Sequence, residues 1–600
     1  LLTWSDTPVG GWYDKDDQLV PESEIFERYR DEVVARSGVR FFHDDGPLHD
    51  GHTPEAAVVF LDRDITFTVD DEAEARSYVD EDPQFSVASQ TAFGEWQVTR
   101  KAGAQVRVPR RATLNRRIGG LFPTDFDPAR WGVPASMLDS IDPIAVWNLV
   151  SAVDAFVSAG FSPAELLRFI HPADLACTQG TGFGGMRSMH KLFVDRFLGE
   201  EYPQDILQET LPNVVAAHTM QSYIGGYGSM INPVGACATA AVSIEEGVDK
   251  IAAHKADFVV AGAIDDIQVE SIVGFGSMNA TANSQELLDR GISPRFVSRA
   301  NDRRRGGFVE AQGGGTVLLT RASVAVEMGL PVLAVVAHAQ TFADGAHTSI
   351  PAPGLGALAV ARGGASSPLA RSLAALGVGV DDVAFVSKHD TSTNANDPNE
   401  SDLHTRVGRA LGRSAGNPLL VVSQKTLTGH AKGGACVFQV GGIIDAFRSG
   451  VIPANIALDC VDDKMEQYSP LVWLRSPLDL SARGPVRAAF ATSLGFGHVS
   501  GFLALVHPGA FEAVVEREAG SEALARWRSA SDARLRAGSR HFEMGMLGHA
   551  PLFEPVDARR LPDDPALGAA GDPHEVEAQM LLDPRARLGA DGYYHLPDQQ

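Results

Sequence analysis

The chain has 600 residues, more than one hydrophobic core usually organises, so we expect several cores or one large doubled architecture. Hydrophobic residues make up 44% of the sequence and charged residues 21%, the ordinary balance of a globular protein. The formal net charge of −25 argues against non-specific binding to nucleic acid or to anionic membranes by the chain as a whole.

Cysteine spacing and the length of the apolar runs exclude further classes. No CxxC pair occurs and no histidine stands at zinc-ligand spacing, so we expect neither a structural zinc site nor a disulfide framework. We therefore expect the protein to work in a reducing compartment. The four cysteines are Cys177, Cys237, Cys436 and Cys460. No apolar run is long enough to span a bilayer, so we expect no membrane-spanning segment, and we expect no signal peptide. The start at Leu1 suggests a piece of a longer polypeptide, or else a processed terminus.

Residues 1–120 mix short strand-like runs with acidic loops. The runs EAAVVFLD (55–62) and ITFTV (65–69) are examples. This texture predicts a small lead-in or linker region rather than a large core.

Residues 121–507 alternate between short apolar runs and helical stretches. The runs typical of buried strands lie at 257–266, 314–320, 382–390 and 418–424, and the helical stretches include 238–254 and 400–412. Such alternation predicts an α/β fold with a largely parallel sheet covered by helices on both faces, in two consecutive halves.

Residues 508–600 begin helically and then become rich in Pro, Asp and Gly at 561–574. We expect a peripheral, partly irregular tail here.

Cys237 lies in the segment PVGACATAA (233–241), where small residues precede a helix-forming run. This pattern places the sulfur at a sharp turn onto a helix N-terminus. The exposed N–H groups and the helix dipole there stabilise a thiolate, and they can also hold the oxyanion formed when it attacks a thioester. An inert buried cysteine is the alternative.

His389 follows a strand-like run in VSKHDTSTNAND (386–397), at the kind of strand end where α/β proteins place working groups. Thr391 and Thr393 share one face if the loop is extended, and could hydrogen-bond an amide-bearing substrate arm. A capped loop histidine with ordinary turn threonines is the alternative.

His430 lies in QKTLTGHAKGG (424–434), five residues after Lys425. Lys425 comes where a strand is expected to end, so its charge could lie in the site, favour negative species and lower nearby histidine pKa values. A solvent-facing lysine is the alternative.

Two glycine-rich runs have different interpretations. GTGFGG (180–185) resembles a dinucleotide loop, but no acidic residue closes that fingerprint about twenty residues later, so nucleotide binding is rejected. SLGFGHVSG (493–501) would place a backbone turn and Phe496 at a sheet end, as a second oxyanion donor or a hydrophobic gate.

With these segments in place, the chain resembles the β-ketoacyl synthase region of a type I fatty acid synthase of the fungal and actinobacterial kind. The resemblance spans roughly residues 121–507 and rests on the Cys237, His389, Lys425–His430 and SLGFG segments in order. Further text typical of this subgroup is RRRGGFVEAQGGG (303–315), SIPAPG (349–354) and DILQETLPN (205–213).

The resemblance implies a duplicated thiolase-like fold of five α-β-α-β-α layers, with Cys237 in the first half and both histidines in the second. Residues 1–120 would then be a lead-in region of a larger synthase, and residues 508–600 its C-terminal tail. It also implies a ketosynthase homodimer within a cytoplasmic, hexameric assembly. No cofactor is implied in this segment, because the substrates travel on the phosphopantetheine arm of acyl carrier protein.

The mechanism implied by the resemblance has two stages. Cys237 accepts the acyl chain; malonyl-carrier protein then loses CO2, and His389 and His430 stabilise the resulting carbanion, which attacks the Cys237 thioester. The N–H groups of Cys237 and Phe496 would form the oxyanion hole. The remaining roles are charge organisation by Lys425, pantetheine binding by Thr391 and Thr393, and loop ordering by Asp397 and Glu400.

Two residues depart from the family pattern. Asp390 stands where most ketosynthases have a glycine after the histidine, and His498 follows GFG where many have another glycine. A polyketide synthase module and a non-condensing scaffold or chain-length partner remain alternatives. A degradative thiolase is disfavoured, because it would carry a second cysteine in the SLGFGHVSG loop, which has none. A coenzyme-A-dependent initiating synthase is disfavoured because it would have Asn in place of His430.

Overall fold

The computed structural model describes residues 2–42, 52–123, 126–197, 201–345, 354–553, 555–556 and 573–595. The chain forms two compact units, a large one of Leu1–Phe42 with Ile118–Gln600 and a small one of His43–Arg117. No helix in the described part of the chain is both long and apolar enough to cross a membrane.

The expected lead-in region of residues 1–120 is therefore not one unit. Strand β4 (Val39–Phe41) pairs antiparallel with β10 (Ile118–Gly120), and Val39 and Ile118 share a buried apolar cluster with Val297 and Val309. This pairing and packing tie residues 1–42 to the large unit. The other elements of this segment are β1 (Thr3–Ser5), β2 (Gly11–Tyr13), β3 (Leu19–Val20) and α1 (Glu22–Ala35).

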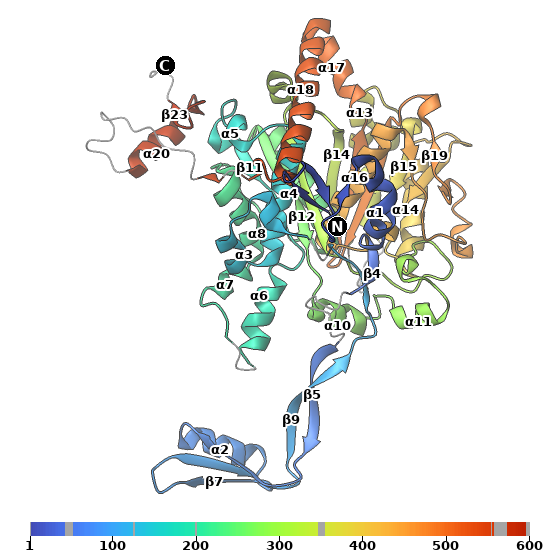
Figure 1. Ribbon diagram of the computed structural model, residues 1–600. Helices are drawn as coiled ribbons and strands as arrows, with labels where there is room; N and C mark the ends of the chain where they lie inside the picture. Colours follow the sequence, from blue (N-terminus) through green and yellow to red (C-terminus); the bar gives the residue numbers. More distant parts are fainter. Residues whose placement is uncertain are drawn as a thin grey trace. The chain divides into compact units, whose positions relative to one another are not determined.

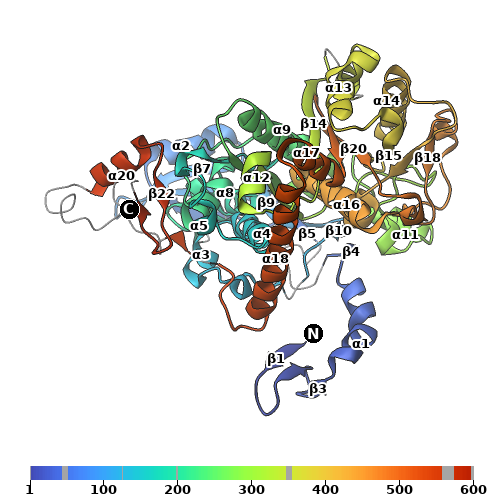
Figure 2. The ribbon, with the colours of Figure 1, turned by 90° about the horizontal axis from the view of Figure 1, so that it is seen from above.

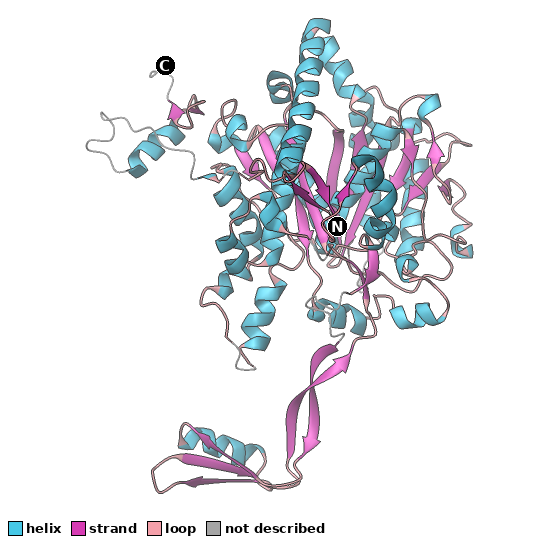
Figure 3. Cartoon of the chain, in the orientation of Figure 1, coloured by secondary structure: helices cyan, strands magenta, loops and turns pink. Residues whose placement is uncertain are grey.

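The small unit has its own strands and one helix (Figure 3), and a small apolar core around Val69, Ala75 and Val98. Its elements are β5 (His52–Phe60), β6 (Ile65–Val69), α2 (Glu72–Glu81), β7 (Ser86–Gln90), β8 (Trp96–Arg100) and β9 (Gln105–Thr113). Strands β5 and β9 form an antiparallel ribbon, and β6, β8 and β7 form a three-stranded sheet in that order. The Asp71 side chain caps α2 by accepting the N–H of Glu74.

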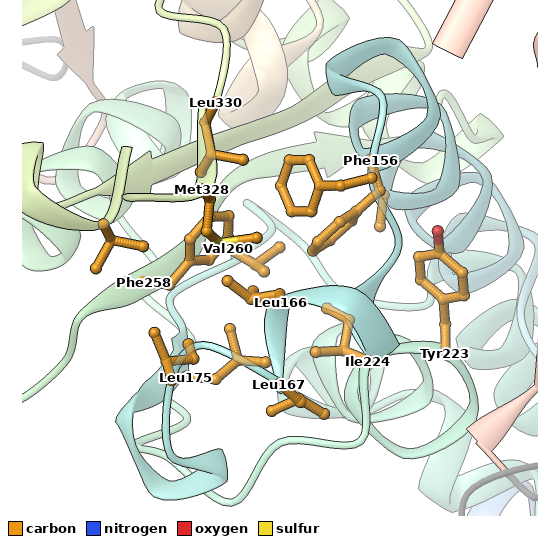
Figure 4. Close-up of a cluster of buried hydrophobic side chains, with 14 of the residues drawn as sticks. Phe156, Leu166, Leu167, Leu175, Tyr223, Ile224, Phe258, Val260, Met328 and Leu330 are labelled. Atoms are coloured by element: carbon orange, nitrogen blue, oxygen red, sulfur yellow. The ribbon is translucent and has the colours of Figure 1, made fainter. Parts of the chain in front are cut away.

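The first sheet of the large unit has the order β11 (Leu175–Cys177), β12 (Phe258–Asp265), β13 (Gly313–Thr320). Helices α4 (Pro143–Ala159), α8 (Pro212–Thr219), α12 (Ala322–Met328) and α18 (Ser521–Met546) share one apolar cluster with these strands. Figure 4 shows Phe156 of α4 near Phe258 and Val260 of β12. Phe156 is fully buried, and truncating such a residue to alanine costs about 3–5 kcal/mol.

The second sheet has the order β14 (Val335–Ala343), β21 (Val499–Val506), β20 (Ala488–Gly495), β15 (Val383–Ser387), β16 (Leu419–Val422), β18 (Leu471–Trp473). Its outer face packs on α13 (Pro368–Ala375) and α14 (Asn396–Ala410). The expectation of a largely parallel arrangement holds only in part. The pairs β11–β12, β20–β15, β15–β16 and β16–β18 are parallel, but β13 runs antiparallel to β12, and β21 antiparallel to both β14 and β20. Both sheets are mixed.

Helices α9 (Thr239–Ala252) and α16 (Ala435–Ser449) form the layer between the sheets. One buried cluster contains Ile244 of α9, Ile443 of α16, Ala263 of the first sheet and Phe385 of the second. The large unit therefore has the five expected α-β-α-β-α layers. In both views α4, α8 and α18 lie toward one side of it, and α13 and α14 toward the other (Figures 1 and 2).

The C-terminal segment packs on the large unit. Trp527 of α18 donates a hydrogen bond to the Leu330 carbonyl, and α18 follows α17 (Gly509–Ala519). Leu588 joins the first apolar cluster beside Leu167, so the end of the chain is less peripheral than expected. The predicted irregular stretch 561–574 lies almost wholly outside the described residues. The last elements are α20 (Pro573–Leu582), β22 (Arg587–Leu588) and β23 (Tyr594–His595).

Short elements connect the layers. They are α3 (Ala135–Ser140), α5 (Pro163–Leu166), α6 (Met186–His190), α7 (Ile206–Glu209), α10 (Val269–Ser277), α11 (Ser284–Asp289), α15 (Lys425–Thr428), β17 (Val451–Ile452) and β19 (Leu478–Asp479).

Candidate active site

Cys237 lies in the turn that leads into α9. Ala236 before it has φ +46°, a left-handed conformation that side chains rarely adopt, and a short 3-10 turn of Ala236–Ala238 runs into the helix. The end of β20 packs directly on this turn: Ser493 Oγ donates to the Cys237 carbonyl at 2.8 Å. A Cβ on Gly495 would lie 2.3 Å from the Gly235 carbonyl oxygen, so only glycine permits this approach.

His389 follows β15 by two residues and is held through its backbone. Its N–H donates to Glu400 at 2.5 Å, and Lys425 Nζ donates to its carbonyl oxygen. The same Nζ lies 3.2 Å from His389 Nδ1. The backbone position of His389 is thus fixed from two sides.

His430 follows Gly429, whose φ of +73° turns the chain after α15. The His430 N–H donates to the Val309 carbonyl at 2.7 Å, and its ring lies edge-on to Phe308 with centroids 5.2 Å apart. Among the described residues, neither ring nitrogen of His430 has a hydrogen-bond partner, although the side chain is buried. Two unpartnered buried nitrogens are available to a substrate.

These three side chains converge. A ligand atom of each, the Cys237 sulfur and a ring nitrogen of both histidines, lies within 4.8 Å of the other two. The histidine rings are nearly perpendicular at 88°, with centroids 5.1 Å apart. A thiol and two imidazoles are also a metal-binding donor set, but the Lys425 ammonium beside His389 opposes a cation there.

Burial and charge keep both histidines neutral. The pKa values of His389 and His430 lie well below their usual range because burial disfavours the charged imidazolium and Lys425 repels it. Burial also lowers the pKa of Lys425, although nearby Glu400 and Cys237 oppose that shift. The expected effect of Lys425 on the histidines is confirmed.

The expected stabilised thiolate at Cys237 is wrong for the unliganded site. Burial raises the pKa of the Cys237 thiol to about 11, and this outweighs the opposing effects of Lys425 and of a hydrogen bond from the Phe496 N–H. The helix N-terminus is present as predicted, but the surrounding apolar packing was not visible in the local sequence.

The remaining predicted residues surround the His389 loop. Thr391 and Thr393 share one face, with their hydroxyl oxygens 3.2 Å apart. Glu400 accepts the N–H groups of His389 and Asp390. Burial would raise its pKa, but the nearby His404 side chain, the charge of Lys388 and a hydrogen bond from Thr492 lower it to about 2.

Asp397 lies further from the ring. It accepts the backbone N–H of Asn301 at 2.8 Å and pairs with Arg305 at 3.5 Å. Burial and the neighbouring Asp390 raise the pKa of Asp397 to about 7. Asp397 thus contacts Asn301 and Arg305, whereas Glu400 contacts the backbone of the His389 loop directly.

Phe496 lies on the turn after β20, half-buried, with its ring 5.6 Å from Phe275. Phe275 also contacts Phe183 and Phe308, at 6.0 and 5.1 Å between centroids. These rings form an apolar wall that leads from a partly exposed residue, Phe183, to His430.

Several buried polar residues beside the site were not identified from the sequence. Lys388 and Asp390 form an ion pair, Lys432 pairs with Glu310 at 3.0 Å, and Asp265 accepts the N–H groups of Gly182 and Gly433. A local signal existed only for Lys388 and Asp390, which flank His389. The others become neighbours only through the fold.

Two family profiles match this chain. One, described as "Beta-ketoacyl synthase, N-terminal domain", matches residues 86–325, and the other, "Beta-ketoacyl synthase, C-terminal domain", matches residues 333–459. Together they cover more than half of the chain. Cys237 falls in the first profile, and His389 and His430 fall in the second.

Curated relatives match nearly the whole chain. "Fatty acid synthase 2" of Mycosarcoma maydis is 32% identical over 98% of this chain, and "Fatty acid synthase subunit alpha" of Saccharomyces cerevisiae is 29% identical over 97%. The chain spans only 15% and 35% of those two proteins.

Among solved structures, the ketosynthase FabY from P. aeruginosa matches with a TM-score of 0.79 at 22% identity, over 92% of this chain and 85% of that one. This match shows a shared thiolase-like fold. Together with the two profiles and the buried Cys–His–His arrangement, it leads to one conclusion: the chain belongs to the β-ketoacyl synthase family and is a ketosynthase enzyme.

Proposed function

We propose that this chain is the condensing part of a type I fatty acid synthase, and that it extends an acyl thioester by two carbons at the expense of a malonyl thioester. The observation that carries this proposal is the convergence of one buried thiol with two neutral imidazoles. Nearly all of this chain matches part of two fungal fatty acid synthases, and these matches support fatty acid synthesis as the process in which it acts.

In the first half-reaction Cys237 becomes acylated. Its thiol proton passes to a neutral imidazole, the sulfur attacks the carbonyl carbon of the acyl thioester, and the carrier leaves as a thiolate that takes up the proton. The N–H groups of Cys237 and Phe496 stabilise the tetrahedral oxyanion. The hydrogen bond from the Phe496 N–H to the Cys237 thiol supports this role.

In the second half-reaction the malonyl group loses CO2. The electrons of the broken C–C bond move into an enolate, whose oxygen accepts hydrogen bonds from His389 and His430. Its carbon then attacks the Cys237 thioester, and collapse of the adduct releases the Cys237 sulfur and the 3-oxoacyl product. Neutral imidazoles donate hydrogen bonds here without offering a readily lost proton to the carbanion.

The positioning roles follow from the contacts. Lys425 holds the His389 backbone, Glu400 and Asp397 order its loop, and the Thr391–Thr393 face is offered to the phosphopantetheine arm. Acyl carrier protein as donor, a ketosynthase dimer and a cytoplasmic hexameric assembly belong to the same proposal.

Labelled acyl thioester tests the nucleophile. Wild-type chain should become covalently labelled and then release label as 3-oxoacyl product when malonyl thioester is added. Cys237→Ala should not be labelled, while Cys436→Ala, which removes another buried thiol, should be. Label that persists in the Cys237→Ala chain would refute the assignment.

Histidine variants test the division of labour. His389→Ala and His430→Ala should lose malonyl decarboxylation by about 100-fold or more, and lose much less of the acylation rate. Equal losses in both half-reactions would contradict the proposed roles.

A further inference from the structure

The residues on either side of His389 carry opposite charges and meet each other in the interior. Lys388 Nζ lies 2.6 Å from Asp390 Oδ1, and both side chains are fully buried. The histidine ring contacts His430 and Lys425, whereas the Asp390 side chain contacts Asn301 and Ser423. Glu400 accepts the backbone N–H groups of both His389 and Asp390. The pair therefore anchors the chain away from the reacting atoms.

Asp390 occupies a backbone conformation that favours glycine. Its φ is +33°, and Ser392 two residues later has φ +63°. The Asp390 carboxylate compensates by accepting hydrogen bonds from Asn301 Nδ2 at 2.7 Å and Ser423 Oγ at 2.5 Å. The side chain thus holds a turn that a glycine would adopt without help.

Lys388 is equally well enclosed. Its ammonium donates to Ser401 Oγ at 3.0 Å and to the Asp397 carbonyl and Asn301 Oδ1, both at 3.3 Å. Burial alone would lower the pKa of Lys388, but the Asp390, Glu400 and Asp397 carboxylates raise it. The lysine is therefore charged, and Asp390 is the carboxylate in contact with it.

We propose that the Lys388–Asp390 ion pair is a positioning device for His389, which holds the backbone of residues 388–390 in the turn that keeps the His389 ring beside Cys237 and His430. This inference rests on the proposed function of that site. Neither residue touches the reacting groups. Removing one partner takes away the opposite charge in contact with the other, and the buried charge that remains pulls the turn out of place.

The pair makes a prediction about combined substitutions. Lys388→Met keeps the length of the side chain without its charge, and Asp390→Gly supplies the residue that tolerates positive φ unaided. Each single variant should lose malonyl decarboxylation by roughly tenfold or more, because small displacements of a reacting group are costly. Acylation of Cys237 should change much less.

The double variant K388M/D390G should recover most of the lost decarboxylation, since it removes both charges of the pair and its glycine tolerates the positive φ of residue 390. Asp390→Asn keeps the side-chain shape and serves if a single variant fails to fold; a smaller decarboxylation defect of the same kind is expected. Single variants with wild-type decarboxylation, or a double variant worse than both singles, would overturn the proposal.

Leu373→Ala is the matched control for destabilisation alone. Leu373 is fully buried in α13, within a different cluster. At equal folded fraction this variant should keep wild-type ratios of decarboxylation to acylation. If it shifts the ratio as far as Lys388→Met does, the pair is merely structural.

Crystal structures of the variants provide a readout that needs no reaction. The His389 ring should move away from Cys237 in each single variant and return in the double variant; an unmoved ring in the single variants would overturn the positioning role. A wild-type chain that neither acylates nor decarboxylates would instead refute the proposed function, while the ring positions would still decide the role of the pair.

Discussion

At the scale of single residues, Cys237 is held as a thiol rather than a thiolate. Burial raises its pKa to about 11, while the Lys425 charge and the Phe496 N–H lower it. Two neutral histidines lie within reach of the sulfur. The Cys237 thiol therefore becomes a nucleophile only when its proton passes to a histidine. The apolar surroundings that raise its pKa also suit the binding of an acyl chain.

This balance predicts how the thiol responds to pH. Because the folded pKa lies near 11, the thiolate fraction rises about tenfold per pH unit through the neutral range, with no plateau near pH 8. Carbamidomethylation of the Cys237 peptide, followed by mass spectrometry, should follow that slope. A plateau near neutral pH would show that the thiolate forms readily.

Lys425→Met should make alkylation of Cys237 slower than in the wild-type chain. Lys425 lowers the pKa of Cys237, so its loss raises that pKa, and each unit costs about tenfold in thiolate at a fixed pH. Lys464→Met, which removes an exposed lysine, is the control and should react like wild type. Faster alkylation in the Lys425→Met chain would contradict the electrostatic assignment.

At the scale of elements, the local patterns located the secondary structure well. The predicted helix 238–254 corresponds to α9, Thr239–Ala252, and the predicted strand 257–266 to β12, Phe258–Asp265. The predicted strand 382–390 is too long, because β15 ends at Ser387. The Lys388 N–H still donates to the Val422 carbonyl of β16. Beyond the end of the strand, the Lys388 and Asp390 side chains meet buried polar partners that come from distant parts of the chain.

Strand direction was the larger error. Strands β13 and β21 contain apolar runs like those of the parallel strands, yet they run antiparallel to their neighbours. A run of apolar residues indicates that both faces of a strand are buried, but not which way the adjacent strand runs.

The contact between β20 and the nucleophile turn gives an element-scale prediction. Gly495→Ala should lower the rate of Cys237 acylation by about tenfold or more, because the new methyl group would meet the Gly235 carbonyl at 2.3 Å and push the turn. The rate of Cys237 labelling by a labelled acyl thioester, in samples quenched at successive times, measures this loss.

Gly441→Ala in α16 is its control. No atom lies within 4 Å of the position where a Cβ would be added at Gly441, and alanine favours a helix over glycine by about 1 kcal/mol. This variant should acylate normally and unfold at a slightly higher temperature. Equal activity of the two variants would show that the turn tolerates displacement.

At the scale of the whole molecule, the chain forms two compact units with separate cores. The large unit contains all of the candidate active-site residues, and the small unit has a separate core around Val69, Ala75 and Val98. In the large unit Phe41 stands opposite Ile118 in the β4–β10 pair. The two points at which the chain passes between the large unit and residues 43–117 are therefore adjacent.

Replacing residues 43–117 with a short Gly/Ser turn should therefore leave a folded, reactive large unit. Antiparallel partners can be joined by about two to four residues. The shortened chain should show a cooperative unfolding transition and acylate Cys237 within about threefold of the wild-type rate, a difference of less than 1 kcal/mol. An unfolded or unlabelled product would show that the small unit is required.

The sequence alone predicted the candidate reactive residues and determined most element positions, the doubled α/β class and the resemblance to ketosynthases, because all of these depend on local motifs and hydrophobic periodicity. Only the tertiary structure decided the directions of the strands, the attachment of residues 1–42, the protonation of Cys237 and the buried partners of His389. These depend on which distant segments exclude water from one another, and desolvation and long-range pairing leave no local pattern in the sequence.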